Sequence, residues 1–292
     1  MAARKDTPPR GHSAGRDRPV PGQEGFGLSA GERRDVKDKQ PPRVQVLHET
    51  IRREGDAELA RSAAALAWSA LAAGLSMGFS ALIPALLRAA LPEAPWRGLV
   101  SGLGYPVGFL IVILARQQLF TENTLTAVLP VMSDPGWRRL GQLLRLWGIV
   151  LAGNLAGVAV FAWAMGRMPV LDAATHRELL AMGRELMANS GGQMFTKGII
   201  AGWLIATMVW MVPAAANARA LVILLLTWLI AIGGFTHIIV GSAEVSYLVF
   251  HGGLPLWVAV RDFSLPVLAG NVVGGSVMFA LISHAQVRSD DS

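Results

Sequence analysis

His237 lies in the segment 233-GGFTHIIVGSAE-244, in the middle of a long apolar stretch of the chain. A titratable side chain at membrane depth is costly, and by default it marks a functional site. Because the ordinary pKa of histidine is about 6.5, such a residue exchanges protons near neutral pH. It could protonate a desolvated anion, which would then cross an apolar constriction as the neutral acid. The alternative is a histidine satisfied by backbone carbonyls, without a role in proton transfer.

A second polar interruption, 115-ARQQLFTENTLTAVLP-130, follows the apolar segment 105-YPVGFLIVIL-114. Its polar residues include Arg116, Thr121, Glu122 and Asn123. Broken backbone at membrane depth is tolerated only where it is buried or lines a cavity. Half-helix ends there leave free N–H groups that favour anions. We therefore expect this segment to face a pore. The alternative is a cytoplasmic loop between two spans, although 125-LTAVLPVM-132 is too short to span a bilayer.

The composition predicts that these residues sit on membrane-spanning helices. The chain has 292 residues, of which 52% are hydrophobic and 16% are charged. It has no cysteine, which excludes disulfides, thiolate nucleophiles and Cys-ligated metals. A spanning helix needs about 20 apolar residues. Six segments meet this need: about 63–88, 99–130, 143–165, 194–216, 219–250 and 264–284. A loop of about 28 residues is expected between the third and the fourth.

The two polar interruptions belong to a weak internal repeat. Phe120-Thr121 precedes Asn154 by 34 residues, and Phe235-Thr236 precedes Asn271 by 36. Each half then holds three spans with the middle one broken, and an odd number of spans inverts the second half. Paired interrupted helices of this kind mark the solute site of transporters. The predicted fold is an all-α integral membrane protein of six transmembrane helices, with an inverted 3+3 repeat and broken second and fifth helices.

The ends of the chain differ from its middle. Residues 1–60 hold twelve Lys/Arg and ten Asp/Glu, interspersed, which gives no basic patch for nucleic acid. We predict a disordered cytoplasmic tail over 1–42. An amphipathic interfacial helix is predicted over 43–62, with a solvated linker as the alternative. The transmembrane domain then covers 63–285, and 286–292 is a C-terminal tail. Basic residues in the connections favour both termini in the cytoplasm.

Four segments carry a resemblance to a known family. They are 105-YPVGFLIVILARQQLFTEN-123, 198-GIIAGWLIATMVWM-211, 234-GFTHIIVGS-242 and 265-LPVLAGNVVGG-275. Together, over about residues 45–285, the chain resembles the formate/nitrite transporter family. The resemblance implies a homopentamer in the inner (plasma) membrane, with an aquaporin-like pore in every protomer. It also implies passage of formate, nitrite or hydrosulfide, often with a proton, and no cofactor or metal.

The resemblance assigns roles to residues of the broken helices. His237 matches the central histidine of the family, and Thr121 matches its loop threonine, which would hydrogen-bond the histidine or the solute. A hydroxyl that caps its own half-helix is the alternative for Thr121. Phe120 matches a constriction residue, and so do Tyr105 and Phe109, which lie one helical turn apart. Plain packing is the alternative for these aromatic side chains.

Other matched positions depart from the family pattern. Ile230 occupies the position of a further pore aromatic residue. Gly202 stands where many members have asparagine, which would remove a polar side chain from the pore. Thr236 stands where some members carry glutamate. Arg116 and Glu122 flank Leu-Phe-Thr, where small residues are commoner. We expect Glu122 to cap the following half-helix or to pair with Arg116.

Three residues are expected to support the pathway. Lys197 precedes Gly198 at a helix entrance, where it would attract anions or extend to lipid headgroups. Asn154 and Asn271 hold matching places in the two halves. We expect them to bond free backbone groups of the broken helices rather than solute.

Three other functions remain open from the sequence. A pore for neutral solutes would fit the repeat, although no Asn-Pro-Ala loop occurs. An intramembrane enzyme could use Ser242 and Glu244 near His237, but no hydrolase motif supports one. A non-transporting scaffold or sensor is suggested only by the long tail.

Overall fold

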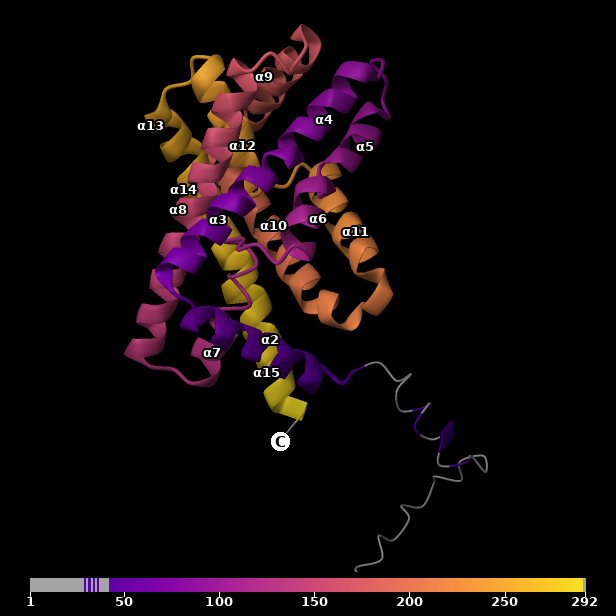
Figure 1. Cartoon of the computed structure of the whole chain (residues 1–292), viewed down its shortest axis with the longest axis vertical. Helices are drawn as coiled ribbons and strands as arrows, with labels where there is room; N and C mark the ends of the chain where they lie inside the picture. The colour runs from indigo at the N-terminus through magenta and orange to yellow at the C-terminus, as the bar shows by residue number, and fades with distance from the viewer. Residues whose placement is uncertain (1–28, 30, 33, 35, 37–41, 291–292) are drawn as a thin grey trace, which may run out of the picture. The chain divides into compact units, whose positions relative to one another are not determined.

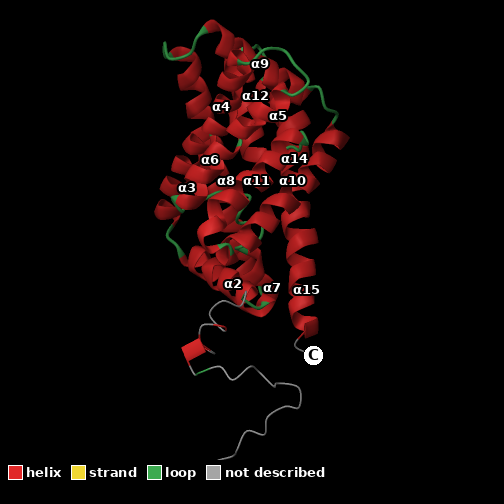
Figure 2. Ribbon diagram, turned by 90° about the vertical axis from the view of Figure 1, so that its right-hand side faces the viewer, coloured by secondary structure: helices red, strands yellow, loops and turns green. Residues whose placement is uncertain are grey.

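The computed structural model describes residues 42–290, together with Ser29, Gly31, Glu32, Arg34 and Val36. The chain divides into two units, Met1–Pro41 and Pro42–Ser292. In the first unit the Ser29 hydroxyl donates to the Glu32 carboxylate, and the predicted disordered tail otherwise lies outside the described residues. The second unit is all-helical, with no strand in its described part (Figure 1, Figure 2).

The helices follow one another with short connections. They are α2 (Val44–Ala60), α3 (Ala63–Met77), α4 (Phe79–Ala90), α5 (Arg97–Ser101), α6 (Pro106–Leu114), α7 (Val128–Ser133), α8 (Trp137–Arg167), α9 (Ala173–Met187), α10 (Gly191–Met211), α11 (Arg219–Ile232), α12 (Ile238–His251), α13 (Leu256–Val258), α14 (Leu265–Val272) and α15 (Leu281–Asp290). Short 3₁₀ and π turns join several of them into longer rods.

The lengths of these rods fit the predicted spans. Five rods in the described part are long and apolar enough to cross a membrane: Ala63–Ala90, Arg97–Leu114, Trp137–Arg167, Gly191–Ala214 and Leu256–Val287. Two shorter apolar helices, α11 and α12, are separated by a break before His237. A second break separates α6 from α7. The predicted six-helix architecture with broken second and fifth helices is therefore confirmed.

The first break begins with a tight turn at the end of α6. The N–H of Gln117 donates to the Val112 carbonyl at 2.9 Å, and the N–H of Arg116 donates to the Ile113 carbonyl at 3.2 Å. This pair of bonds is the Schellman arrangement, which places its penultimate residue in the left-handed region. That residue is Arg116, with φ at 54°. The turn directs the chain away from the helix axis.

The second break begins with the same turn at the end of α11. The N–H of Phe235 donates to the Ile230 carbonyl at 3.0 Å, and the N–H of Gly234 donates to the Ala231 carbonyl at 3.1 Å. Gly234 takes the left-handed position, with φ at 58°. Residues 112–117 therefore correspond to residues 230–235. The Phe-Thr pairs used to align the halves in the sequence are not equivalent, and that alignment was wrong by three residues.

Replacing Arg116 by glycine is expected to raise the free energy of unfolding by about 1 kcal/mol, because a side chain in the left-handed region costs about this much. The Arg116 side chain is 80% exposed and lies 3.8 Å from Glu54, so little is lost with it. Thermal unfolding in detergent would measure the change. A lower midpoint for Arg116→Gly would contradict the assigned strain.

A buried asparagine fixes the chain after the first break. Asn154 on α8 accepts a hydrogen bond from the Phe120 N–H at 2.9 Å. Its amide group donates to the carbonyls of Ala70 and Gln118, both at 2.8 Å. Asn154 is 0% exposed. One side chain thus ties α3, α8 and the broken segment together.

Asn271 on α14 makes the same three bonds in the second half. It accepts from the Ile238 N–H at 2.9 Å, and it donates to the carbonyls of Gly198 at 2.9 Å and Thr236 at 3.0 Å. Phe120 therefore corresponds to Ile238, in the register already set by the turns. The predicted role of both asparagines, bonding backbone groups of broken helices, is confirmed.

Glycines allow the long helices to approach the asparagines closely. A Cβ on Gly157 of α8 would lie 2.7 Å from the Cα of Gly74 on α3. A Cβ on Gly270 of α14 would lie 3.0 Å from the Cα of Gly198 on α10. Small residues at such crossings are the usual means of close packing in membranes. In each half, two helices thus cross closely at a pair of glycines, and a buried asparagine lies beside the crossing.

The connection between the third and fourth spans is a helix, α9, and the expected loop is therefore wrong. The Asp172 carboxylate accepts from the Thr175 N–H at 2.7 Å and caps the helix. This hydrogen bond lowers the pKa of Asp172 below its ordinary value. Leu179 and Met182 are buried. The charged residues on either side of this segment hid its apolar face in the sequence.

Helix α2 occupies most of the segment predicted as an interfacial helix, so the linker alternative is wrong. It packs against α7 and α15 at one end of the unit (Figure 1). Its buried residues include His48, Ile51 and Leu59. Helix α15 continues to Asp290, beyond the predicted boundary at 285. The position of α2 at a membrane interface stays a prediction.

Acidification is expected to loosen α2 from α15. His48 is 7% exposed, and one ring nitrogen lies 3.1 Å from a ring nitrogen of His284. Burial, and then the proximity of His284, lower the pKa of His48 from its ordinary 6.5. Because the undocked state binds the proton more readily, docking is stable above pH 6.5 and weakens as the pH falls through the lowered value. Hydrogen exchange of α2 should accelerate over this range, and His48→Gln should flatten the dependence. Hydrogen exchange of α2 that does not change with pH would contradict the proposed effect of His48.

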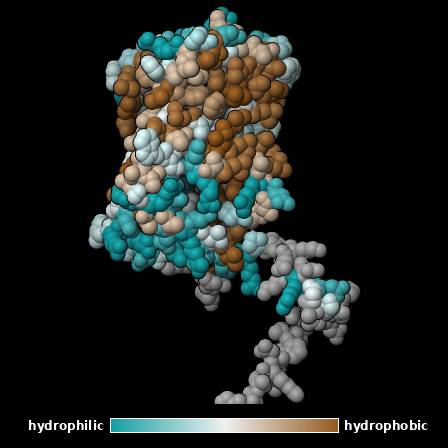
Figure 3. Space-filling model, in the orientation of Figure 1, coloured by the Kyte–Doolittle hydropathy of each residue, from teal (hydrophilic) through white to brown (hydrophobic). Residues whose placement is uncertain are grey.

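The visible surface of the second unit carries a broad apolar band between hydrophilic ends (Figure 3). Large exposed apolar side chains include Trp68, Leu114, Leu144, Val160, Leu221 and Ile282. A surface of this kind faces lipid or neighbouring subunits rather than water.

Candidate functional site

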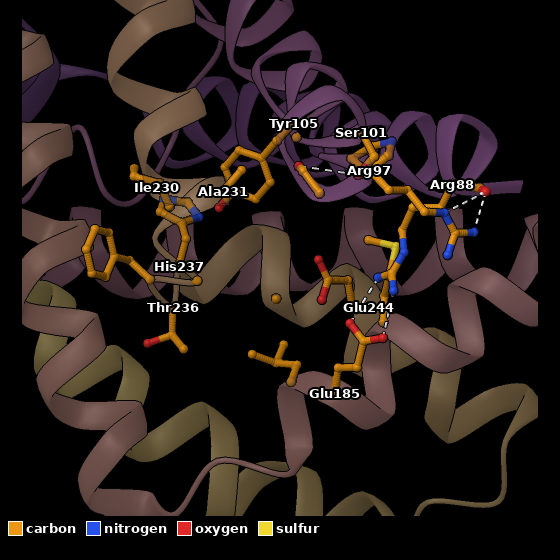
Figure 4. Close-up of a pocket in the computed structure, with 18 of the residues that line it drawn as sticks. Arg88, Arg97, Ser101, Tyr105, Glu185, Ile230, Ala231, Thr236, His237 and Glu244 are labelled. Carbon is orange, nitrogen blue, oxygen red and sulfur yellow. Dashed lines mark hydrogen bonds and ion pairs between the residues drawn. The ribbon is translucent and has the colours of Figure 1, made fainter. Parts of the chain in front are cut away.

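A distal cavity of about 530 Å³ opens at the end of the unit that holds α4, α5 and α9. Figure 4 shows His237, Thr236 and Ile230 on one side of it and Arg88 and Glu185 on the other. The residues of the predicted pathway that line it are Tyr105, Lys197, Ile230, Thr236 and His237. This cavity reaches the histidine from one side only.

A proximal cavity of about 380 Å³ opens at the opposite end, beside α2. Arg116, Glu122 and Asn123 of the broken segment line it, with Glu54 and Glu58 of α2. The Asn123 side chain donates to the Gln118 side chain at 3.0 Å and to the Leu119 carbonyl at 3.1 Å, which holds the loop in shape. The segment predicted to face a pore thus lines a cavity.

A sealed layer separates the two cavities. Thr121, Phe120 and Phe109 line neither cavity, and none of them is more than 2% exposed. The Thr121 hydroxyl lies 2.8 Å from Nε2 of His237. The ring of Phe109 packs edge-on against the imidazole, with centroids 5.1 Å apart. The histidine and threonine paired from the sequence are therefore in contact across the barrier.

The hydrogen bonds of His237 indicate a neutral imidazole. Its Nδ1 accepts from the Val240 N–H at 3.3 Å, so His237 is the N-cap of α12. A ring nitrogen that accepts carries no proton, and the proton of the neutral ring is then on Nε2. Nε2 donates this proton to the Thr121 hydroxyl. Both ring nitrogens therefore have a hydrogen-bond partner: Nδ1 bonds the first turn of α12, and Nε2 bonds Thr121 in the sealed layer.

The aromatic residues of the predicted constriction occupy two places. Tyr105 and Phe109 pack together with centroids 5.6 Å apart, and Tyr105 lines the distal cavity together with His237. Phe120 lies against Trp147 of α8, with centroids 5.7 Å apart. The Trp147 Nε1–H donates to the Asn123 carbonyl at 3.1 Å, which fixes this pair. Phe109 therefore contacts the imidazole directly, whereas Phe120, next to Thr121 in the chain, packs on Trp147.

Three expectations about individual residues need correction. Gly202 lines neither cavity, because it crosses α14, where a Cβ would lie 2.4 Å from the Asn271 carbonyl oxygen. Glu122 does not pair with Arg116, whose ion-pair partner is Glu54. Glu122 does not cap α7 either, since that helix has no side-chain cap.

Lys197 and Thr236 lie where the sequence placed them, but with defined partners. The Lys197 ammonium donates to the Asn189 side chain at 2.6 Å. It lines the distal cavity, which disfavours the alternative that it extends to lipid. The Thr236 hydroxyl donates to the Met194 carbonyl at 2.8 Å, so it supports the loop before His237.

The distal cavity also holds a cluster of charges that was not predicted from the sequence. The guanidinium of Arg88 lies 2.7 Å from Glu185 and 3.2 Å from Glu178. Arg97 binds Glu178 at 2.8 Å and also contacts Glu93. Ionisable residues inside apolar spans were the available signal. From the sequence, Glu244 is proposed only as a possible residue of an enzyme.

The fold has six crossings, and two of them are broken. The broken segments meet at a histidine that lies between two opposed cavities. This arrangement defines a membrane channel or transporter. A sequence model described as formate/nitrite transporter matches residues 45–285. The chain belongs to the formate/nitrite transporter family.

Individual relatives agree with this assignment. The inner membrane protein YfdC of Escherichia coli is 52% identical over 256 residues, 88% of this chain and 83% of that one. The formate channel FocA of Haemophilus influenzae is 24% identical over 242 residues, 74% of this chain and 84% of that one. A solved pentameric formate channel with formate bound superposes with a TM-score of 0.68 at 22% identity, covering 78% of this chain and 98% of that chain. This last likeness shows the fold.

Proposed function

We propose that the protein conducts small monovalent anions, or the weak acids formed from them, through the barrier at His237 and together with a proton. The observation that carries the proposal is the contact of His237 with Thr121 between two cavities that open at opposite ends. An anion leaving water for such a buried site would lose hydration that the barrier does not replace. A neutral acid loses far less hydration free energy on entering the same site.

Formate is the first solute to test, because FocA of Haemophilus influenzae is a formate channel. The relative YfdC is an inner membrane protein, and we extend that location to this chain, with both termini in the cytoplasm and the distal cavity outside. The solved relative is a pentameric formate channel, and we propose a homopentamer with one pore per protomer.

The experiment is influx into proteoliposomes, with and without an inward proton gradient. Formate, nitrite, hydrosulfide, acetate and lactate are compared in the wild type, His237→Ala and His237→Asn. We expect wild-type influx to grow with the gradient. Because asparagine is a good N-cap, His237→Asn keeps the start of α12 while removing the imidazole. Both variants should lose most of the influx.

The outcome decides between this proposal and its alternatives. Absence of influx for every solute in well-folded wild-type protein would leave a scaffold or sensor with the same fold. Influx that is independent of both the gradient and His237 would favour a pore for neutral solutes. Full influx in His237→Asn would contradict a role for the imidazole in passage.

A further inference from the structure

The carboxylate of Glu244 has no assigned role, and it lies in the distal cavity. Figure 4 shows it between His237 and the pair formed by Arg88 and Glu185. Glu244 follows His237 by seven residues on α12, so the two share a helix face about 10 Å apart. Among the described residues, no hydrogen bond or ion pair involves the Glu244 carboxylate. A carboxylate in such a place is costly, and by default it marks a functional site.

The other charged groups of this cavity are engaged. The pairs are Arg88 with Glu178 and Glu185, Arg97 with Glu178 and Glu93, and Lys197 with Asn189. Arginine does not release its proton in proteins. The Tyr105 hydroxyl, with an ordinary pKa of about 10, is a much weaker acid than a carboxylic acid. Among the described residues that line the cavity, Glu244 is therefore the acid available to a solute.

His237 cannot supply the proton in its observed state. Its Nδ1 accepts from Val240, and its single proton on Nε2 is donated to Thr121. Removing that proton would leave an imidazolate, which is not accessible near neutral pH. A solute anion that reaches the barrier must therefore have gained its proton earlier on the pathway. The distal cavity is the last aqueous compartment before the barrier.

We propose that Glu244 is the proton donor that converts small monocarboxylates into their neutral acids in the distal cavity, an inference that rests on the proposed function. The O–H bond of the protonated Glu244 carboxyl breaks, and a new O–H bond forms on the solute carboxylate. Glu244 keeps the electron pair as its carboxylate, and the solute leaves as the carboxylic acid. A hydronium ion of the distal aqueous phase returns a proton to the Glu244 carboxylate and is left as water.

The chemical class of the solute follows from acid strength. Glutamic acid has an ordinary pKa of about 4.3, close to that of other carboxylic acids. Proton transfer between two groups of similar acidity changes the free energy little, which favours rapid exchange in both directions. Small monocarboxylates match Glu244 in this respect.

The groups around Glu244 are compatible with a protonated carboxyl. Arg88 of α4 and Glu185 of α9 are its charged neighbours, and they neutralise each other. Glu178 of α9 is held by Arg88 and Arg97. Arg261 and Asp262 pair with each other, His176 contacts Tyr247, and His251 contacts the Ala162 carbonyl. Arg177 and Arg184 of α9 are exposed. The arginines of α8 lie towards its ends, and α3 and α14 carry no charged residue.

The test measures formate influx into proteoliposomes at an outer pH of about 6. Glu244→Gln keeps the size and polarity of the side chain but has no proton to release. We expect its influx to fall at least tenfold, and Glu244→Asp to keep at least half of the wild-type rate. The matched control is Glu93→Gln, since Glu93 lines the same cavity with a side chain 84% exposed in its pair with Arg97. Its influx should equal that of the wild type.

Formamide separates proton donation from pore shape, because it is neutral and close to formic acid in size. Glu244→Gln should conduct formamide at the wild-type rate while losing formate influx. Equal loss of both solutes, or wild-type formate influx in Glu244→Gln, would overturn the inference. A wild-type protein without formate influx would instead count against the proposed function, and the inference would fall with it. If His237→Asn loses formate influx while Glu244→Gln keeps it, the proposed function is supported and the role of Glu244 is contradicted.

Discussion

Replacing Asn271 by alanine is expected to lower the free energy of unfolding by about 2–6 kcal/mol. The change removes three hydrogen bonds at once. It leaves the Ile238 N–H and the Thr236 carbonyl without a partner, whereas the Gly198 carbonyl keeps its bond within α10. Each buried polar group left unsatisfied costs about 1–3 kcal/mol. Because Asn271 is 0% exposed, water cannot readily replace the lost amide. Thermal unfolding of the purified protein in detergent would measure the loss.

The two halves of the repeat provide an internal comparison. Asn154→Ala removes the equivalent bonds to Phe120, Ala70 and Gln118, and should cost a similar amount. Asn217 is exposed and lies in a connection, so Asn217→Ala should leave the midpoint unchanged. A midpoint for Asn271→Ala equal to that of the Asn217 control would show that the side chain does not hold the break.

Replacing Gly202 by alanine should destabilise the protein by about 3 kcal/mol, at the upper end of the usual cost of overpacking. The added Cβ would lie 2.4 Å from the carbonyl oxygen of Asn271 and 2.9 Å from its Cα. Both are backbone atoms, which cannot rotate away. The displaced Asn271 would also strain its bond to Ile238, so passage through the barrier should fall together with stability.

A glycine without neighbours gives the control for this prediction. A Cβ on Gly148 of α8 would meet nothing within 4 Å. Gly148→Ala should therefore be neutral or slightly stabilising, because alanine favours the helix. Equal midpoints for Gly202→Ala and the wild type would show that α10 can move away from α14 at little cost.

The sequence was sufficient for the architecture because its main signals are local. Long apolar segments define the crossings, and polar residues inside two of them define the breaks. The pairing of Asn154 with Asn271 followed from Gly-Asn segments at similar spacing. The register of the repeat was wrong because the two Phe-Thr pairs have the same residue types but do not occupy equivalent positions in the two halves. Only the helix-ending turns, which are backbone geometry, identify the equivalent residues.

The site was predictable in part. The contact between His237 and Thr121 was expected from the resemblance, since each carries a recognisable motif. The ion pairs of Arg88 and Arg97 with Glu178 join segments far apart in the chain, and a single sequence gives no pairing information over that distance. Gly202 was misplaced for a related reason. A glycine leaves no side chain to show whether it faces a cavity or another helix.

The register of the repeat also makes the proposed pathway asymmetric. Leu119 occupies, in the first half, the position that His237 occupies in the second, and it is 0% exposed. Two nearly identical backbone frames therefore carry different chemistry at their centres. In the proposed pathway, a solute arriving from the distal side meets Glu244 and then the imidazole, whereas one from the proximal side meets Glu122 and finds no titratable group at the position of Leu119. Equal and opposite gradients need not drive equal currents, and rectification would be a property of the side chains rather than of the fold.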